Sequence, residues 1–597
     1  MSRIGGVVGK LTDDQIADRM LNTMRKNRYP IQECFVDTDC CLLFSGPEAS
    51  NCKAAGEWDA IVFDGAIYNC NEVRKELLGL GYGFSSDSQA EVVLRAYMQW
   101  KEKSLLHLNG IFSFAIWSSK ERTLFLARDR IGVKPLFYSH SDSVLYFGSE
   151  IKTILAHPDV PALINDQSVA QLLLLGPGRI QGSGVFKDIL ELKPGHYAQF
   201  SDGKLSVHQY WKLTDREHEE SFEETAEHVR YLLLDAISRQ LDGLEEIGAF
   251  LSGGLDSSIV SRVCFDICQM NGLPLKTFSV DYKDQEKYFT ANKFQPETDR
   301  YYIELMRTQI HSQHHDVFLS PDDLIKHLDD ATIARDLPGM GDVDFSLLAF
   351  CNHIGQHVNV ALSGECADEI FGGYPWYRDP EIRATEGFPW AQNTQFRAGF
   401  IRPEFLENLN PNDYIMDLYR STINRSDILP GTNRINRRTK ELVNLNFDWF
   451  MQTLLDRNDR MSTHYGLDVR VPYCDYRIAE YLYAVPWEMK DHGNKEKGLL
   501  RYAMRGLIPE QVLYRKKSPY PKTFDPQYTK NVIEKLKEVL DDPNSPILSI
   551  VRKDALEKLM TAKFDWPWYG QLMRLPQTIA FMLQMNRWMD IYKVKIV

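Results

Sequence analysis

The sequence predicts a two-domain protein, in which an α+β domain over residues 1–212 precedes an α/β domain over residues 213–597. Short apolar runs alternate with turn residues in the first part, which is typical of a sheet-rich domain. Beyond Ile247, strands alternate with helices, as they do in a parallel sheet covered by helices. The C-terminal part of the second domain is mainly helical and rich in aromatic residues. At roughly 150 residues per domain, the length accommodates this organisation.

The apolar runs of the first domain predict four strands and two helices. The strands are expected at residues 58–63, 124–127, 144–147 and 196–200, and the helices at residues 87–101 and 167–175. An acidic stretch over residues 215–227 leads into a helical pattern of apolar residues, which are Val229, Leu232, Leu233, Ile237 and Leu241. We therefore place the domain boundary just before this stretch. In the second domain, strands are expected at residues 247–251, 276–280 and 358–362.

Composition excludes several classes of protein. With 69 Lys and Arg against 82 Asp and Glu, the formal net charge is −13, so nucleic acid is not an expected partner. No apolar run reaches the roughly 18–20 residues of a membrane span, and the first residues lack the apolar core of a signal peptide. We therefore expect no membrane partner and a cytoplasmic location. The ten cysteines form no CxxC pair, which favours reduced, buried thiols.

A phosphate-binding loop is predicted directly after the strand that ends at Leu251. Two glycines allow the backbone to approach an anion, and the following helix adds positive potential at its N-terminus. A carboxylate inside the loop, Asp256, would repel phosphates unless a divalent cation lies between them, so it implies Mg²⁺. The candidate phosphate-binding residues are Ser252, Gly253, Gly254, Asp256, Ser257 and Ser258.

A second loop follows the strand that ends at Leu362. Three carboxylates lie within five positions beside small residues, and α/β folds bind ligands at such strand ends. We expect Asp368 to complete the Mg²⁺ site with Asp256. We expect Ser363 and Gly364 to contact a bound nucleotide, and Glu365 to lie closer to an acid that reacts with it.

Together, the run from Ser252 to Ser258 (SGGLDSS) and the run from Leu362 to Tyr374 (LSGECADEIFGGY) resemble the asparagine synthetase B family. The resemblance continues through Leu455-Asp456-Arg457 and Lys497-Gly498-Leu499. It implies an N-terminal glutaminase domain with the layered sandwich of N-terminal-nucleophile hydrolases. It also implies a C-terminal synthetase domain of the ATP pyrophosphatase (PP-loop) type, of the adenine nucleotide alpha-hydrolase fold.

This resemblance implies an amide ligase that uses ATP and Mg²⁺ and forms AMP and pyrophosphate. The substrates would be a small carboxylic acid, aspartate in the usual member, and ammonia or another amine. Leu251 and Val280 would hold the adenine, Lys497 matches the catalytic lysine, and Glu365 would accept the proton of the amine. A homodimer and a separate ammonia source both stay open.

The glutaminase site is expected to be degenerate. The family's N-terminal cysteine nucleophile corresponds to Ser2, and its Asn-Gly-Glu clamp reads Asp64, Gly65 and Ala66. The segment 25–30 and the turn at Asp87 also depart from the family pattern. We expect no useful glutamine hydrolysis. The alternative is that Ser2 acts as a hydroxyl nucleophile with its own α-amino group as the base.

Two other functions are open to the sequence. One is intramolecular amide formation, as in β-lactam synthetases or lasso-peptide cyclases, which also resemble this family and lack the cysteine. The other is a scaffold without turnover. Glu365 weighs against the first, because it suits an external amine, and the intact set of Asp256, Asp368, Glu365 and Lys497 weighs against the second.

Overall fold

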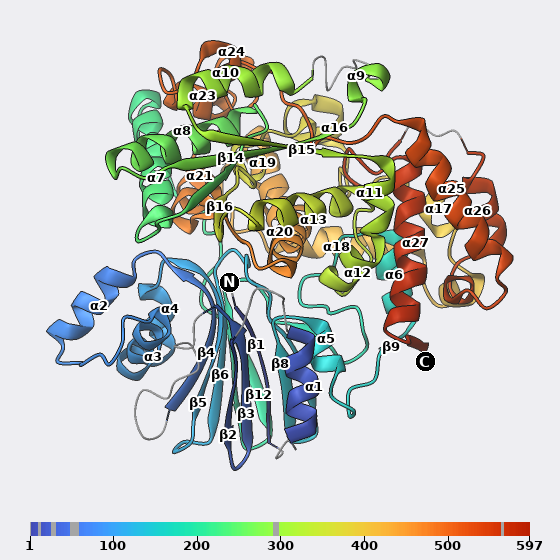
Figure 1. Ribbon diagram of the computed structural model, residues 1–597, viewed down its shortest axis with the longest axis horizontal. Coiled ribbons are helices and arrows are strands. Elements are labelled where there is room, and N and C mark those ends of the chain that lie inside the picture. The colour runs from blue at the N-terminus through green and yellow to red at the C-terminus, as the bar shows by residue number, and fades with distance from the viewer. Residues whose placement is uncertain (1, 10–13, 25–30, 48–58, 290–297, 563–565) are drawn as a thin grey trace. The chain divides into compact units, whose positions relative to one another are not determined.

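The computed structural model describes the chain except for residues 1, 10–13, 25–30, 48–58, 290–297 and 563–565, and it forms two compact units (Figure 1). The first unit comprises residues 1–165, 180–212 and 595–597, and the second comprises residues 166–179 and 213–594. The segment 166–179 therefore departs from the sequence boundary. Its helix α6 (Asp166–Leu174) is almost wholly buried and contacts α17 (Thr394–Ala398) of the second unit, which explains where it packs.

The first unit is built around two antiparallel sheets. One has the strand order β10-β7-β8-β1-β3-β2 and the other β12-β11-β6-β5-β4. The first sheet consists of β1 (Arg3–Val8), β2 (Ile31–Asp37), β3 (Cys40–Gly46), β7 (Phe137–Ser141), β8 (Val144–Gly148) and β10 (Leu190–Glu191). The second consists of β4 (Asp59–Ile67), β5 (Gly110–Ser118), β6 (Thr123–Arg128), β11 (His196–Ser201) and β12 (Lys204–Gln209).

Two apolar cores hold these sheets in layers. One core lies between the sheets and includes Ile4, Val62 and Phe147, because alternate residues of each strand face the opposite sheet. The other lies between the second sheet and the helices α2 (Cys70–Gly79) and α3 (Gln89–Trp100). With α1 (Asp14–Met24) against β3, the unit has the helix–sheet–sheet–helix order visible in Figure 1.

The predicted elements of the first unit match the observed ones closely. The strand predictions at 124–127, 144–147 and 196–200 correspond to β6, β8 and β11, and the prediction at 58–63 to β4, although residue 58 lies outside the described residues. Helix α3 begins at Gln89 rather than 87. The Ser88 side chain accepts a hydrogen bond from the Ala90 amide and caps the helix there.

The second unit contains a five-stranded parallel sheet with the strand order β15-β14-β13-β16-β17. The chain moves outward from β13 to β15 and then returns to the other side of β13, so the order reverses between β13 and β16. Parallel sheets of this kind bind ligands at the carboxyl ends of the strands, at such a reversal. The strands are β13 (Ile247–Phe250), β14 (Leu275–Tyr282), β15 (Gln313–Leu319), β16 (Val360–Leu362) and β17 (Asp468–Arg470).

Helices cover both faces of this sheet, because right-handed crossovers on the two sides of the reversal lie on opposite faces. In Figure 1, α8 (Leu255–Met270) and α10 (Arg300–Ile310) lie on one face, and α13 (Asp342–Gly355) and α20 (Met451–His464) on the other. Among the described residues, no helix has the length and apolar character needed to cross a membrane. Further helices of this unit are α7 (Phe222–Leu241), α21 (Tyr476–Ala484), α23 (Gly498–Ala503), α25 (Pro526–Asp541) and α27 (Leu575–Ile591).

Lys490, at the end of α22 (Trp487–Lys490), is a buried cation that makes stability depend on pH. Its pKa is lowered to about 7, chiefly by burial and also by nearby Lys440, while Asp215 opposes the change. Between about pH 7 and the ordinary lysine pKa of 10.5, the unfolded chain binds a proton that the folded chain does not, so this group makes stability rise with pH across that window. We expect Lys490→Met to have a larger free energy of unfolding than the wild type near pH 7, and we expect this difference to shrink as the pH rises toward 10.5. Urea unfolding across this pH range measures the difference. Lys537→Met, at an exposed position, is the control. A difference between Lys490→Met and the wild type that does not change with pH would contradict the prediction.

Candidate active site

A cavity of about 260 Å³ lies in the second unit at the reversal between β13 and β16. Leu251 follows β13, Val280 belongs to β14, and Ser363 follows β16, and all three line this cavity. The Leu251 amide donates to the Phe278 carbonyl at 2.8 Å, which ties the end of β13 to β14. The two predicted loops therefore meet at the place where the sheet topology favours a ligand.

The first loop owes its shape to Gly253, whose φ is +68°. A Cβ atom at this position would lie 2.7 Å from the Cβ of Tyr302 and 2.8 Å from the Ile303 amide nitrogen, so no larger residue fits. The Ser257 hydroxyl accepts from the Ser252 amide at 3.2 Å and lies 2.9 Å from the Ser252 hydroxyl. These bonds hold the loop open in front of the N-terminus of α8, as a phosphate-binding loop requires.

Gly364 brings the second loop into contact with the first. A Cβ there would lie 2.8 Å from the Ser257 amide nitrogen, so the close approach needs glycine. At Gly373, a Cβ would lie 1.9 Å from Oδ1 of Asp368, so glycine leaves the room that this carboxylate occupies. Cys366 between them has a left-handed backbone with φ 74°, a conformation that costs free energy and is concentrated at functional sites.

Two carboxylates and two lysines form a charge cluster in the cavity. The Lys497 Nζ atom lies 2.6 Å from Oδ2 of Asp256 and 2.8 Å from Oδ1 of Asp368. The Lys517 Nζ atom lies 2.5 Å from Oδ2 of Asp368. Lys497 is only 3% exposed and has a left-handed backbone at the start of α23. We call these four residues the carboxylate–lysine cluster.

The electrostatics of the cluster favour the charged forms of Lys497 and Asp368, whereas burial opposes the charge on Asp256. Burial alone would lower the pKa of Lys497, but the facing carboxylates of Asp256 and Asp368 outweigh burial and raise it. Burial likewise raises the pKa of Asp368, and Lys497 and Lys517 together reverse this and hold it well below its usual range. Burial raises the pKa of Asp256, with Lys497 opposing the rise. Lys497 therefore stays cationic at neutral pH.

The residues present fit a bound Mg²⁺ ion. Oδ1 of Asp256 is buried and accepts no hydrogen bond from any described residue, which leaves an oxygen available as a ligand. Asp368 shares Lys497 with it, and carboxylate oxygens beside phosphates are the ligands that Mg²⁺ prefers. Asp256 and Asp368 are thus the residues that could hold the ion.

Glu365 pairs with Arg457 on the other side of the cavity. The Arg457 Nη2 atom donates to Oε1 of Glu365 at 2.8 Å, and its guanidinium lies 5.2 Å from the ring centroid of Tyr520. The second oxygen, Oε2, is buried and has no hydrogen-bond partner among the described residues. Burial raises the pKa of Glu365, with Arg457 opposing the rise. Glu365 thus presents one fixed and one uncommitted oxygen, as a proton acceptor needs.

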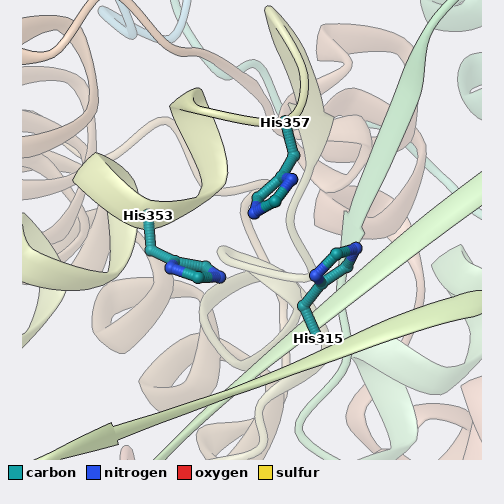
Figure 2. Close-up of side chains that lie close together, drawn as sticks. All are labelled: His315, His353 and His357. Carbon is teal, nitrogen blue, oxygen red and sulfur yellow. The ribbon is translucent and has the colours of Figure 1, made fainter.

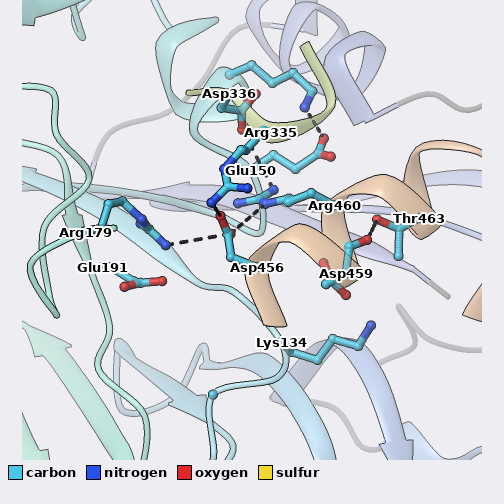
Figure 3. Close-up of polar contacts among 12 residues, drawn as sticks. Lys134, Glu150, Arg179, Glu191, Arg335, Asp336, Asp456, Asp459, Arg460 and Thr463 are labelled. Atoms are coloured by element: carbon cyan, nitrogen blue, oxygen red, sulfur yellow. Dashed lines mark hydrogen bonds and ion pairs between the residues drawn. The ribbon is translucent and has the colours of Figure 1, made fainter. Parts of the chain in front are cut away.

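A buried ion network fixes the helix that carries Arg457 (Figure 3). Asp456, the preceding residue on α20, faces three guanidinium groups, those of Arg335 at 3.6 Å, Arg179 at 3.7 Å and Arg460 at 3.4 Å. Although burial raises the pKa of Asp456, these three cations lower it overall. Because Asp456 and Arg457 are adjacent on α20, this network restrains the backbone from which the Arg457 side chain extends.

The comparisons with known proteins agree with this geometry. Residues 228–590 match the asparagine synthase family, and residues 50–211 match the glutamine amidotransferase domain family. The chain is 43% identical, over 92% of its length and 90% of the relative, to the glutamine-hydrolysing asparagine synthetase 3 of Bacillus subtilis. The chain belongs to the asparagine synthetase family. It is accordingly an ATP-dependent ligase, and the predicted fold class is confirmed.

Other asparagine synthetases are more distant. The chain is 28% identical to asparagine synthetase 1 of Bacillus subtilis, over 77% of this chain and 75% of that relative. Among solved structures, an allosteric regulatory enzyme of purine biosynthesis covers 53% of this chain and 80% of its own, with 12% identity and a TM-score of 0.27.

Most of the residues predicted for the asparagine synthetase site line the cavity, but two do not. Gly253 packs against Tyr302 rather than facing the cavity, and Ser258 is fully buried in the first turn of α8. The predicted residues that line the cavity are Leu251, Ser252, Gly254, Asp256, Ser257, Val280, Ser363, Gly364, Glu365, Asp368 and Lys497.

The sequence reasoning missed several cations and aromatic residues of the cavity. Lys517 reaches Asp368 and also lies 3.7 Å from the ring centroid of Tyr374. Arg515 forms an ion pair with Asp299 and donates to the Ser252 carbonyl at 3.3 Å. The one available signal was the basic run from Arg515 to Lys517, which by itself is typical of a solvated surface.

In the first unit, the residues that correspond to the family's glutaminase site form a buried ion network. The Ser2 amide donates to Oδ1 of Asp64 at 3.3 Å, and Arg3 contacts Oδ2 of Asp64 at 3.1 Å. The Lys134 Nζ atom lies 3.9 Å from Asp64, and Arg3 lies 3.4 Å from Glu150. The side chains of Arg3, Asp64 and Lys134 are inaccessible to solvent. Ser2 therefore faces a carboxylate that is already held by cations.

The other predicted glutaminase residues lie in different settings. Gly65 has φ +139° and packs against the Ile111 carbonyl, so its glycine serves strand packing, and Ala66 is buried beside it. Asp87 is exposed and lies 3.9 Å from Arg74, and within the described residues no hydrogen bond or ion pair joins it to Ser2 or Asp64. The segment 25–30 lies outside the described residues.

Proposed function

We propose that this asparagine synthetase family member activates the side-chain carboxylate of aspartate, or of a close analogue, as an acyl-adenylate and transfers ammonia to it. We also propose that Mg²⁺ bound by Asp256 and Asp368 assists, and that glutamine hydrolysis has been lost. The observation that supports the ligase part is the carboxylate–lysine cluster within the cavity that Glu365 also lines.

The proposed reaction has two steps, and residues of the cavity can be assigned to each. First, an oxygen of the acid attacks the α-phosphorus of ATP and pyrophosphate leaves, while Lys497 and Lys517 face the charge that develops on the phosphate oxygens. Bound Mg²⁺ would add positive charge beside the phosphates. Second, ammonia attacks the acyl carbon, Glu365 takes its proton, and AMP leaves. Arg457 keeps Glu365 oriented throughout.

The proposed loss of glutamine hydrolysis is supported by the surroundings of Ser2. Hydrolysis of glutamine passes through an oxyanion, which needs hydrogen-bond donors at the nucleophile. The Ser2 backbone amide donates to the Asp64 carboxylate, and a carboxylate this close to the nucleophile is an acceptor that would repel an oxyanion. A serine hydroxyl is also a weaker nucleophile than a cysteine thiolate. The Bacillus relative is named as glutamine-hydrolysing, so this chain would differ from it in its nitrogen donor.

One experiment separates the two parts of the proposal. Pyrophosphate, asparagine and glutamate are measured with ATP, Mg²⁺ and L-aspartate, in the presence of ammonium, of glutamine, or of neither. We expect asparagine with ammonium and no glutamate from glutamine at a comparable rate. Glutamate release at the rate of AMP formation would refute the loss of glutaminase and leave the ligase proposal standing. Pyrophosphate release that does not depend on aspartate would refute aspartate as the acid.

The variant Ser2→Cys serves as the matched control for the nucleophile. Because Arg3, Asp64 and Ala66 remain in place, we expect the thiol alone to restore little glutamine hydrolysis. Restoration to the rate of ammonia-dependent synthesis would show that the nucleophile was the only defect.

A further inference from the structure

Three histidines converge on the face of the parallel sheet that α13 covers, outside the cavity described above (Figure 2). His315 lies on β15, His353 in the last turn of α13, and His357 in the turn that leads to β16. The centroid of the His357 ring lies 4.3 Å from that of His315 and 4.9 Å from that of His353. One ring nitrogen from each histidine lies within 4.8 Å of the other two.

We propose that His315, His353 and His357 form a binding site for a divalent transition-metal ion of the zinc class. Imidazole nitrogens prefer zinc, copper and nickel, whereas Mg²⁺ prefers oxygen ligands. Three protein nitrogens leave a fourth tetrahedral position for water. The chain would thus hold two chemically distinct metal sites, one of carboxylates and one of imidazoles.

The surroundings leave the three rings available as ligands. None of them has a hydrogen bond or ion pair with a described side chain, whereas the neighbouring His314 contacts Thr277 and Asp316. Each ring is half-buried, so an ion can reach it.

The backbone holds the three histidines at positions from which their rings can bind one ion. Ligands 2.0–2.1 Å from a tetrahedral zinc ion lie about 3.4 Å apart, so the nitrogens need only small rotations of the side chains to meet that geometry. The turn with His357 is held by a hydrogen bond from Lys276 to its carbonyl at 2.8 Å. On the other side, the ring of Phe278 stacks on His315, with 5.0 Å between centroids and 16° between planes. Lys276 thus donates to the backbone carbonyl of His357 and not to its ring.

Metal binding by the full-length chain tests this proposal directly. Protein purified without a polyhistidine tag is freed of metal with a chelator and titrated with Co²⁺ and with Zn²⁺ in excess Mg²⁺. We expect one ion per chain, a visible Co²⁺ spectrum of tetrahedral type, and X-ray absorption that reports nitrogen ligands at about 2.0–2.1 Å. No stoichiometric binding, or a ligand shell of oxygen or sulfur, would overturn the proposal.

Single variants show whether these histidines are the ligands. We expect His353→Gln and His357→Gln each to weaken Zn²⁺ binding more than about 10-fold. Even the loss of a residue that only hydrogen-bonds to a metal ligand lowers metal affinity by about 10-fold or more. His208→Asn, at an exposed position of β12, is the matched control and should bind as the wild type does. Circular dichroism establishes that each variant is folded. Unchanged binding in both folded variants would place the ion elsewhere and overturn the assignment, and the absorption spectrum of the wild type decides the question even if a variant fails to fold.

Discussion

Lys497→Met is expected to lower aspartate-dependent pyrophosphate release by about 100- to 1,000-fold, which is the usual cost of removing one donor that faces a developing charge. The methionine keeps the length of the side chain but leaves Asp256 and Asp368 facing each other with Lys517 alone to neutralise them. Loss of one member of a buried ion pair also costs about 3–5 kcal/mol of folding stability. Initial rates of pyrophosphate release, measured beside urea unfolding, report both effects.

Two further variants separate catalysis from stability. Lys497→Arg keeps the positive charge, but its planar guanidinium cannot place one point charge between two carboxylates, so we expect activity to stay low while stability partly recovers. Lys537→Met removes an exposed lysine of α25 and should change neither quantity. Wild-type rates in a folded Lys497→Met protein would be incompatible with the proposed role.

Glu365→Gln is expected to block amide formation while acid activation continues. Glutamine can still accept the hydrogen bond from Arg457, so the side chain should keep its place. It cannot take a proton from the attacking amine, and loss of general base catalysis costs about 10²- to 10⁴-fold. The measurement is a pair of rates, asparagine formation and aspartate-dependent exchange of pyrophosphate into ATP. We expect only the first to fall by this factor.

The control for this substitution is Glu557→Gln, at an exposed position of α26 (Lys553–Leu559), which should leave both rates unchanged. An equal fall of both rates in Glu365→Gln would assign this residue to acid activation rather than to the amine step. Unchanged asparagine formation would exclude it as the base.

Local sequence signals were sufficient to predict the strands and the two loops. The apolar run before Ser252 and the SGGLDSS run itself lie within a few residues of each other, so local rules identify the strand, the turn and the helix start. The start of α3 was placed two residues too early because the prediction did not use Ser88 as the helix cap, although this signal is also local. Helix α6 belongs to the second compact unit although it precedes the predicted boundary, because an apolar helix face indicates that the helix packs but not against which partner.

Charged partners in the site could not be predicted in the same way. Lys517 follows Lys497 by twenty positions and reaches Asp368 only because the chain folds back over the cavity. The pairing of Glu365 with Arg457 likewise joins residues about ninety positions apart. His353 and His357 have a spacing that one helical turn would bring together, yet α13 ends at Gly355, and His315 comes from a different element. Such contacts depend on the tertiary structure, which local sequence periodicity does not predict.

The carboxylate–lysine cluster has a consequence for the order in which ligands enter. Two negative and two positive side chains balance one another before any nucleotide arrives. A metal ion that entered alone would displace the lysines from their carboxylates and leave two cations without counter-ions in a low-dielectric site. A triphosphate supplies those counter-ions. If the site binds ATP and Mg²⁺ as proposed, charge neutrality would favour joint entry of the nucleotide and its metal over sequential entry, and Lys497 would pass from the protein's own carboxylates to the phosphates.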